Sequence, residues 1–121
     1  MSDFIVKDSG KREEYESGMR RDTNEGKPRY DLVVPLLMDE PMLKRWAIHM
    51  AKGALKYGDR NWEKATGLEE YKRFRESAFR HFVQWFMGDT DEDHAAAIFF
   101  NVQGAEYVKE ITGGVHEKPT V

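Results

Sequence analysis

The residues from Gly53 to Lys64 combine cations, hydrogen-bonding groups, an acid and aromatic rings around a glycine turn. A hydrophobic core does not require this mixture. A flat anionic ligand does, because ammonium and guanidinium groups pair with phosphates and an indole ring stacks on a base. The segment therefore indicates a nucleotide-binding turn at a helix end. Its candidate ligand-contacting residues are Lys56, Tyr57, Arg60, Asn61 and Trp62.

Two further clusters offer acids and imidazoles at helical positions, Glu76-Ser77-Ala78-Phe79-Arg80-His81 and Asp91-Glu92-Asp93-His94. Carboxylate oxygens are the ligands that Mg²⁺ and Mn²⁺ prefer, and such ions hold phosphates and activate water. If the helices that carry the clusters pack side by side, Glu76 faces Asp93 or Glu92. Each cluster also has a simpler explanation. Glu76 and Arg80 form an ordinary surface pair, and acids in a first turn complement the helix dipole.

Other polar residues complete the candidate substrate-binding set. Asn101 interrupts an apolar helix, where a buried amide needs a hydrogen-bonding partner. Lys27 and Arg29 lie on a loop with glycine and proline, where backbone amides can also approach an anion. Arg80 and His81 lie beside the aromatic face of a helix. Each of these residues also has a simpler explanation. Lys27 and Arg29 suit a solvated turn, Arg80 suits an ordinary surface charge, and His81 suits the edge of the apolar face with a hydrogen-bonding partner.

The composition limits the classes of function. A chain of 121 residues with 40% hydrophobic content suits one domain, and a net charge of −3 disfavours binding to a nucleic-acid polymer. The absence of cysteine excludes disulfides, thiolate metal sites and cysteine nucleophiles. No apolar run approaches the roughly 20 residues of a membrane span. We therefore expect a cytoplasmic protein without a membrane partner.

The expected fold class is an all-α helical bundle. The polarity pattern divides the chain into an N-terminal arm with a substrate-contacting loop, a helical domain and a tail, at residues 1–31, 32–112 and 113–121. Apolar residues three to four positions apart predict helices at about 36–57, 68–87 and 91–110, the first with a break near Pro41. Short strands are possible only near residues 4–6 and 32–34. Because the third helix is apolar on nearly every side, a homodimer or homotetramer is expected to complete the bundle.

Four segments, read in chain order, carry a family resemblance: Asp22 to Asp31, Gly53 to Lys64, Ser77 to His81, and Asp91 to Ala97 with Asn101. In these segments the chain resembles the phage-borne dATP/dGTP diphosphohydrolases, all-α relatives of the MazG nucleotide pyrophosphohydrolases whose purine-preferring phage members are called MazZ. The similarity covers about residues 20–108. It implies metal-dependent cleavage between the α and β phosphates of a purine nucleoside triphosphate, dGTP or GTP first and also dATP, which releases a monophosphate and pyrophosphate.

The metal ligands do not follow from the resemblance. MazG enzymes carry Glu-x-x-Glu on one helix and Glu-x-x-Asp on the next, whereas here Phe79 and Ala95 stand where the second acids would be. Helix geometry instead assigns the ligands of two or more Mg²⁺ or Mn²⁺ ions to Glu63, Glu76, Glu92, Asp93 and His94. The four acids are also the candidate catalytic residues, with Glu63 either a ligand or the base that orients water. The two histidines His81 and His94 are expected to orient the acids.

Two alternatives stay open at this point. A nucleotide sensor or sequestering module uses the same pocket without turnover, and a structural adaptor needs the helices alone. Release of pyrophosphate from dGTP distinguishes an enzyme from both. One asparagine and one tryptophan do not distinguish guanine from adenine.

Overall fold

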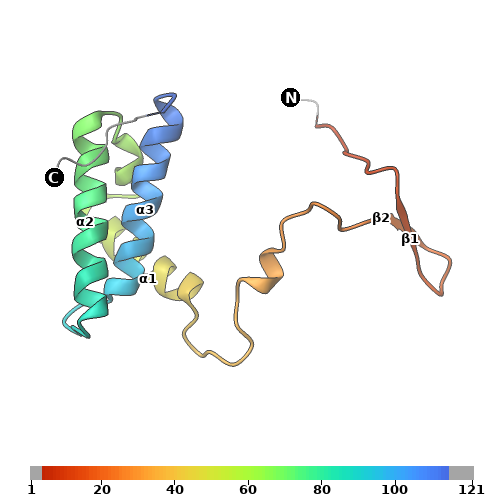
Figure 1. The fold of residues 1–121 in the computed structure, drawn as a ribbon, viewed down its shortest axis with the longest axis horizontal. Coiled ribbons are helices and arrows are strands. Elements are labelled where there is room, and N and C mark those ends of the chain that lie inside the picture. The colour runs from red at the N-terminus through yellow and green to blue at the C-terminus, as the bar shows by residue number, and fades with distance from the viewer. Residues whose placement is uncertain (1–3, 115–121) are drawn as a thin grey trace. The chain divides into compact units, whose positions relative to one another are not determined.

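Apolar side chains at helical spacing build three helices in the computed structural model, which describes residues 4–114. The helices are α1 (Met42–Tyr57), α2 (Leu68–Phe86) and α3 (His94–Ile111), and the short 3₁₀ helix η2 (Asn61–Lys64) joins the first two. The fold-class prediction of an all-α bundle is confirmed. The chain divides into two units, Met1–Val33 and Val34–Val121, and all three α-helices belong to the second (Figure 1).

The first helix is shorter than expected. It begins at Met42, after the N-cap Pro41, and not near residue 36. The residue before a proline is disfavoured in the α conformation, so the helix starts after the proline and does not continue through it. The helix ends as predicted at Tyr57. Gly58 has a φ of 92° and donates its backbone N–H to the Ala54 carbonyl at 2.8 Å.

The third helix begins at His94, three residues later than the sequence pattern indicates. Asp93 is the N-cap residue, and its carboxylate accepts a hydrogen bond from the Ala96 N–H at 3.1 Å. A side chain that caps a helix occupies the position just before the first helical turn. Asp91 and Glu92 therefore lie in the loop between α2 and α3, where their carboxylates are exposed.

Small residues allow α3 to pack closely against α2, and α3 also contacts α1 and η2. Gly104 is the tightest point, because a Cβ atom placed there would lie 2.5 Å from Cε1 of Phe74. Phe74 in turn packs edge-to-face on Phe100, with ring centroids 5.9 Å apart. The buried apolar residues of this interface are Ala95, Ala96, Ala97, Ala105 and Val108.

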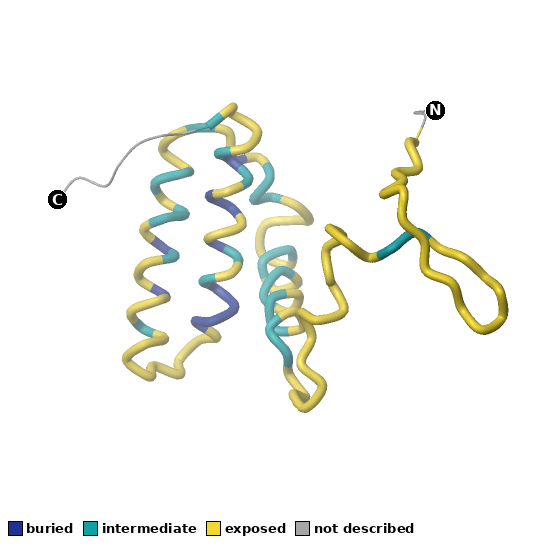
Figure 2. Tube along the Cα trace, turned by 45° about the vertical axis from the view of Figure 1, so that its right-hand side comes forward, coloured by how far each residue is buried: buried dark blue, intermediate teal, exposed yellow. Residues whose placement is uncertain are grey.

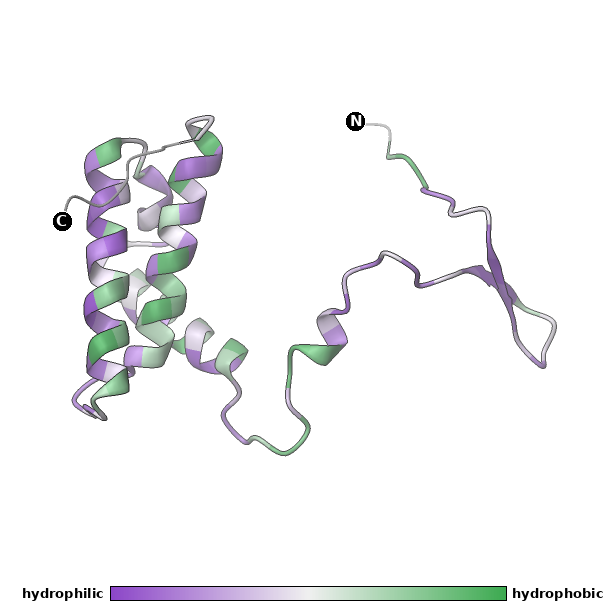
Figure 3. Cartoon of the chain, in the orientation of Figure 1, coloured by the Kyte–Doolittle hydropathy of each residue, from purple (hydrophilic) through white to green (hydrophobic). Residues whose placement is uncertain are grey.

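The opposite side of α2 carries apolar residues that the second unit leaves exposed. Figure 2 shows buried positions mainly along α3, and Figure 3 shows hydrophobic residues interspersed with hydrophilic ones along the helices. Phe79 and Phe86 are 71% and 74% exposed, and Phe82 and Trp85 about half exposed. The aromatic face predicted on this helix therefore points largely away from α3.

The first unit contains a small hairpin of charged residues. Strands β1 (Arg12–Glu14) and β2 (Arg20–Asp22) pair antiparallel with Arg12 opposite Asp22. Neither strand has an apolar face, so periodicity could not reveal them, and the short strands considered near residues 4–6 and 32–34 are wrong. Arg12 pairs with Asp8 and lowers the pKa of that carboxyl to about 2.

Two further sequence predictions concern a membrane span and the C-terminal tail. No described helix is long and apolar enough to cross a membrane. The tail predicted at 113–121 lies outside the described residues beyond Gly114.

Candidate functional site

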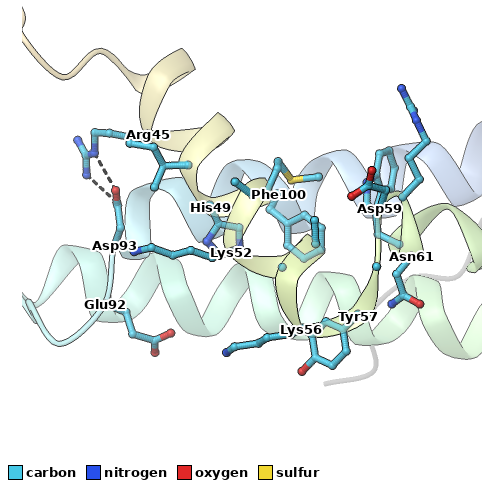
Figure 4. Close-up of a pocket in the computed structure, with 18 of the residues that line it drawn as sticks. Arg45, His49, Lys52, Lys56, Tyr57, Asp59, Asn61, Glu92, Asp93 and Phe100 are labelled. Carbon is cyan, nitrogen blue, oxygen red and sulfur yellow. Dashed lines mark hydrogen bonds and ion pairs between the residues drawn. The ribbon is translucent and has the colours of Figure 1, made fainter.

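A cleft of about 790 Å³ lies in the second unit, bordered by α1, η2 and the loop between α2 and α3 (Figure 4). Its volume falls in the range of small-molecule sites, roughly 300–1,000 Å³. Cationic side chains enter from α1 and the turn after it, and carboxylates enter from the α2–α3 loop. The cleft therefore offers both charges that a nucleotide bound with a divalent cation would need.

One face of α1 carries the cationic side of the cleft. Arg45, His49, Lys52 and Lys56 follow one another at intervals of four, three and four residues, so they share one helical face. Figure 4 shows the amino groups of Lys52 and Lys56 directed toward the end of the cleft that holds the acids. Of these four residues the sequence analysis selected only Lys56. The other three could not be told from ordinary surface residues, because any amphipathic helix carries a polar stripe with the same period as its apolar one.

The glycine turn reaches the cleft as the sequence analysis expected. Its five candidate residues, Lys56, Tyr57, Arg60, Asn61 and Trp62, all line the cavity. Arg60 has a φ of 57° and is the only non-glycine residue with positive φ in the described range 4–114. This conformation is unfavourable for a residue with a side chain and concentrates at functional sites. The guanidinium of Arg60 pairs with the Glu63 carboxylate.

Asp93 ties the acidic loop to α1. Nε and Nη2 of Arg45 donate to its two carboxylate oxygens at 2.9 and 2.7 Å, and the same carboxylate caps α3. The hydrogen bond from Arg45 lowers the pKa of Asp93 and keeps it ionised. Asp93 thus has three donors already, and its predicted role as a metal ligand stays a prediction.

Replacement of Asp93 separates these two contributions to stability. We expect Asp93→Ala to lower the free energy of unfolding by about 1 to 2 kcal/mol, mostly through the lost cap. The ion pair adds little because its side chains are 33% and 37% exposed and water screens them. Asp93→Asn keeps a capping oxygen and should cost only a few tenths of a kcal/mol. Urea unfolding of both variants measures the difference, and equal losses would show that the ion pair dominates.

A second cluster lies where α2 meets the start of α3. His81 and His94 are 7% and 2% exposed, and their Nδ1 atoms are 2.9 Å apart. With Glu92 they form the one group of three potential metal ligands in the described residues, with ligand atoms within 4.8 Å of one another. The loop acid Asp91 accepts from Nε2 of His94 at 2.7 Å. Sequence analysis selected all three members but did not predict that they meet.

One arrangement of protons that satisfies these hydrogen bonds leaves both imidazoles neutral. An ionised Asp91 only accepts, so His94 donates from Nε2, and the hydrogen bond lowers the pKa of Asp91. A neutral His94 then accepts at Nδ1, and His81 donates to it from Nδ1. Burial lowers the pKa of His81, which favours this neutral form. In this arrangement one proton lies between the two Nδ1 atoms, and two neutral imidazoles can be offered to a cation.

The other predicted acids do not join this cluster. Glu76 is exposed on α2, with Arg73 as its partner at 3.9 Å, and Glu63 pairs with Arg60. Glu76 was expected to face Asp93 or Glu92, but it is not a member of the cluster that contains Glu92. The catalytic and metal-binding roles of both glutamates stay predictions.

The remaining residues predicted to contact the substrate do not line the cleft. Two of them, Asn101 and Arg80, belong to the second unit, and Lys27 and Arg29 belong to the first. Asn101 is buried, and its Nδ2 donates to the Ala97 carbonyl at 2.8 Å, so its partner is its own helix. Arg80 is exposed on α2. In the first unit Arg29 pairs with Asp31 at 2.7 Å, and Lys27 lies 3.9 Å from Asp22. Their substrate-binding roles also stay predictions.

His49 is expected to make the stability of the domain sensitive to pH. Its ring packs on Phe100 with centroids 5.3 Å apart, and burial lowers its pKa, although the charges of Asp93 and Glu92 oppose this and those of Lys52 and Lys56 reinforce it. As the pH falls below about 6.5, the unfolded chain takes up the proton first, so stability decreases.

We expect the loss of unfolding free energy between neutral pH and about pH 5 to be smaller in His49→Gln than in the wild type. Urea unfolding at several pH values measures this difference. Parallel pH curves for the two proteins would contradict the assignment.

The structure thus defines a small helical domain with a cleft lined by basic and acidic side chains, beside an imidazole–carboxylate cluster. A protein-family comparison then identifies the chain further. The model described as dATP/dGTP diphosphohydrolase, N-terminal, matches residues 17–111. The chain belongs to this family. The matched range includes both the cleft and the histidine cluster. Searches of curated proteins and of solved structures gave no match.

Proposed function

We propose that this domain hydrolyses purine nucleoside triphosphates, dGTP and GTP first and dATP also, to the monophosphate and pyrophosphate with a divalent cation. The observation that supports this most directly is the cleft. It places the cations of α1 opposite the acids of the α2–α3 loop, in a member of the dATP/dGTP diphosphohydrolase family. The bond broken is the one between the α phosphorus and the bridging oxygen, and water supplies the new oxygen.

The charges of the cleft suit a triphosphate. Lys52, Lys56 and Arg60 would neutralise phosphate oxygens, because ammonium and guanidinium groups form strong hydrogen bonds with them. Trp62, whose ring packs edge-to-face on Tyr107 at 5.1 Å, provides an ordered aromatic surface for a base. Asn61 offers an amide to the base or sugar. These roles account for the position of the predicted turn residues along the cavity.

A divalent cation fits the acidic end of the cleft. Glu92 lines the cavity and belongs to the cluster with His81 and His94, so its carboxylate can face both a cation and the nucleotide. A bound cation would neutralise phosphate charge and make a nearby water more acidic. The sequence analysis proposed Mg²⁺ or Mn²⁺, and Glu92 is the oxygen donor of this cluster that such ions would use.

A homodimer or homotetramer would cover the exposed aromatic face of α2. Phe79, Phe82, Trp85 and Phe86 lie together near the C-terminal half of this helix, and contiguous exposed apolar surface is typical of subunit contacts. We further propose that the protein acts in the cytoplasm, where nucleotide substrates are found. Sedimentation of the purified protein measures the number of subunits.

Product analysis tests the proposed reaction. The protein is incubated with each of the eight common ribo- and deoxynucleoside triphosphates, with Mg²⁺ and separately with Mn²⁺, and products are separated by anion-exchange chromatography. We expect monophosphate and pyrophosphate in equal amounts from the purine substrates. Release of orthophosphate would contradict cleavage at the α phosphorus. Tight binding of intact nucleotide would instead indicate a sensor or sequestering module.

Lys56 provides a test of substrate binding. We expect Lys56→Met to raise KM for dGTP about tenfold, because one charge-assisted phosphate contact is lost, worth about 1.4 kcal/mol. Lys64→Met is the matched control, since Lys64 follows in the same turn region but does not line the cleft. Steady-state kinetics at several salt concentrations measure both. Equal KM values for the two variants would place the triphosphate elsewhere.

A further inference from the structure

We propose that His81, His94 and Glu92 form a site for a transition-metal ion of the Co²⁺, Ni²⁺ or Zn²⁺ class, with Asp91 as its positioning residue. This deepens the proposed function and rests on it for the role of the ion in hydrolysis. The binding itself can be tested without any nucleotide.

The distance between the two imidazoles is the first argument. Two nitrogen ligands of one ion stand about 2.9 to 3.4 Å apart, because metal–nitrogen bonds are about 2.0–2.1 Å and the angle between them is 90° to 109°. The Nδ1 atoms of His81 and His94 are 2.9 Å apart. The two nitrogens therefore already have the separation that a shared ion requires. The ion would replace the shared proton but lie to one side of the line between the nitrogens, because a metal–nitrogen bond is longer than half their separation, so a small rotation of the rings would accompany binding.

Asp91 supplies the outer hydrogen bond that metal-binding histidines usually have. Ligating imidazoles commonly donate their second N–H to a carboxylate, which fixes the ring and makes it a better donor. The Nε2 atom of His94 lies 2.7 Å from Asp91, and its Nδ1 atom is directed at His81 and would bind the ion as the neutral ring's acceptor nitrogen. When an ion binds, the proton of His81 moves from Nδ1 to Nε2, so the two rings release no net proton.

Glu92 can complete the ligand set from the cleft side. It is exposed, and one of its carboxylate oxygens lies within 4.8 Å of a ring nitrogen of each histidine, so rotation of the side chain can bring an oxygen to the ion.

The donor types decide the class of ion. Mg²⁺ prefers oxygen ligands and near-octahedral oxygen cages, whereas imidazole binds ions later in the first transition series. Affinity should therefore rise from Mg²⁺ through Mn²⁺ and Co²⁺ to Ni²⁺ at this site. A site made of carboxylates alone would discriminate much less between these ions.

Calorimetric titration of the whole chain with each of these chlorides, without nucleotide, tests the inference, and the visible absorption of Co²⁺ reports its ligands. We expect one Co²⁺ per chain and an affinity for Co²⁺ at least about 100-fold above that for Mg²⁺. His81→Gln should remove this preference. His49→Gln is the matched control, because it removes an imidazole that belongs to the cleft and not to the cluster.

Asp91→Asn gives a second variant in case loss of a buried histidine prevents folding, because Asp91 is exposed. We expect it to weaken Co²⁺ binding about 10- to 100-fold while the unfolding curve stays close to that of the wild type. Equal affinity for Co²⁺ and Mg²⁺, or unchanged Co²⁺ binding in both cluster variants, would overturn the inference.

The two proposals fail in different ways. Hydrolysis of dGTP with Mg²⁺ by a protein that does not prefer Co²⁺ rejects the transition-metal site and leaves the enzyme. Selective Co²⁺ binding by a protein that hydrolyses none of the eight nucleotides supports the site and rejects the enzyme.

Discussion

Glu92→Gln is expected to lower kcat/KM for dGTP by at least about 100-fold, which corresponds to about 2.7 kcal/mol of transition-state stabilisation. Glu92 lines the cleft and also belongs to the histidine cluster. The hydrogen bond to His94 comes from Asp91, so Glu92 is not needed to orient that ring. The substitution keeps the size of the side chain and removes its charge, so a cation loses its negatively charged ligand. Steady-state kinetics with Mg²⁺ and with Mn²⁺ measure the loss.

Two comparisons make this result specific. Glu69→Gln is the matched control, because Glu69 is an exposed glutamate in the first turn of α2 and does not line the cleft. It should leave the kinetics unchanged. Glu76→Gln tests the ligand set assigned from the sequence. If Glu76→Gln lowers kcat/KM as far as Glu92→Gln does, Glu76 contributes to the site. If Glu92→Gln has the same kcat/KM as the control Glu69→Gln, the role of Glu92 is rejected.

Gly104→Val is expected to lower the free energy of unfolding by about 3 kcal/mol, near the upper end for overpacked cores. A Cβ atom at this position would lie 2.5 Å from Cε1 of Phe74 and within 2.7 Å of two further atoms of the ring. The ring cannot move easily, because it packs edge-to-face on Phe100. Urea unfolding followed by circular dichroism measures the change.

Gly53→Val is the matched control for this substitution. Gly53 also lies inside a helix, but a Cβ atom there would meet nothing within 4 Å. Because valine has a higher helix propensity than glycine, we expect a gain of a few tenths of a kcal/mol. A loss at Gly53 as large as that at Gly104 would show that valine in a helix, and not contact with Phe74, causes the destabilisation.

The helices could be predicted because their signals are local. Residues three and four apart make one face, and Gly58 ends α1 where its positive φ is needed. The starts were predicted less well. Pro41 blocks the helix before it, and Asp93 caps α3, so both helices begin later than apolar periodicity alone suggests. The hairpin could not be predicted because its strands lack apolar residues, and the side chains that face one another across it are charged.

The candidate site was predicted in part for the same reason. The residues of the glycine turn are neighbours in sequence, and they line one cavity. The meeting of His81 and His94 depends on the register between α2 and α3, which no local pattern encodes. The role assigned to Glu76 stays a prediction. Its residue type suits a metal, but its position on the helix directs it toward Arg73 and water.

The glycine and alanines of α3 set how closely α3 approaches α2, and the interhelical distance in turn sets the distance between the imidazoles of His81 and His94. If the metal site that we propose exists, the ionic radius that fits between the rings would depend partly on Gly104, more than two helical turns away from His94, and not on the ligands alone.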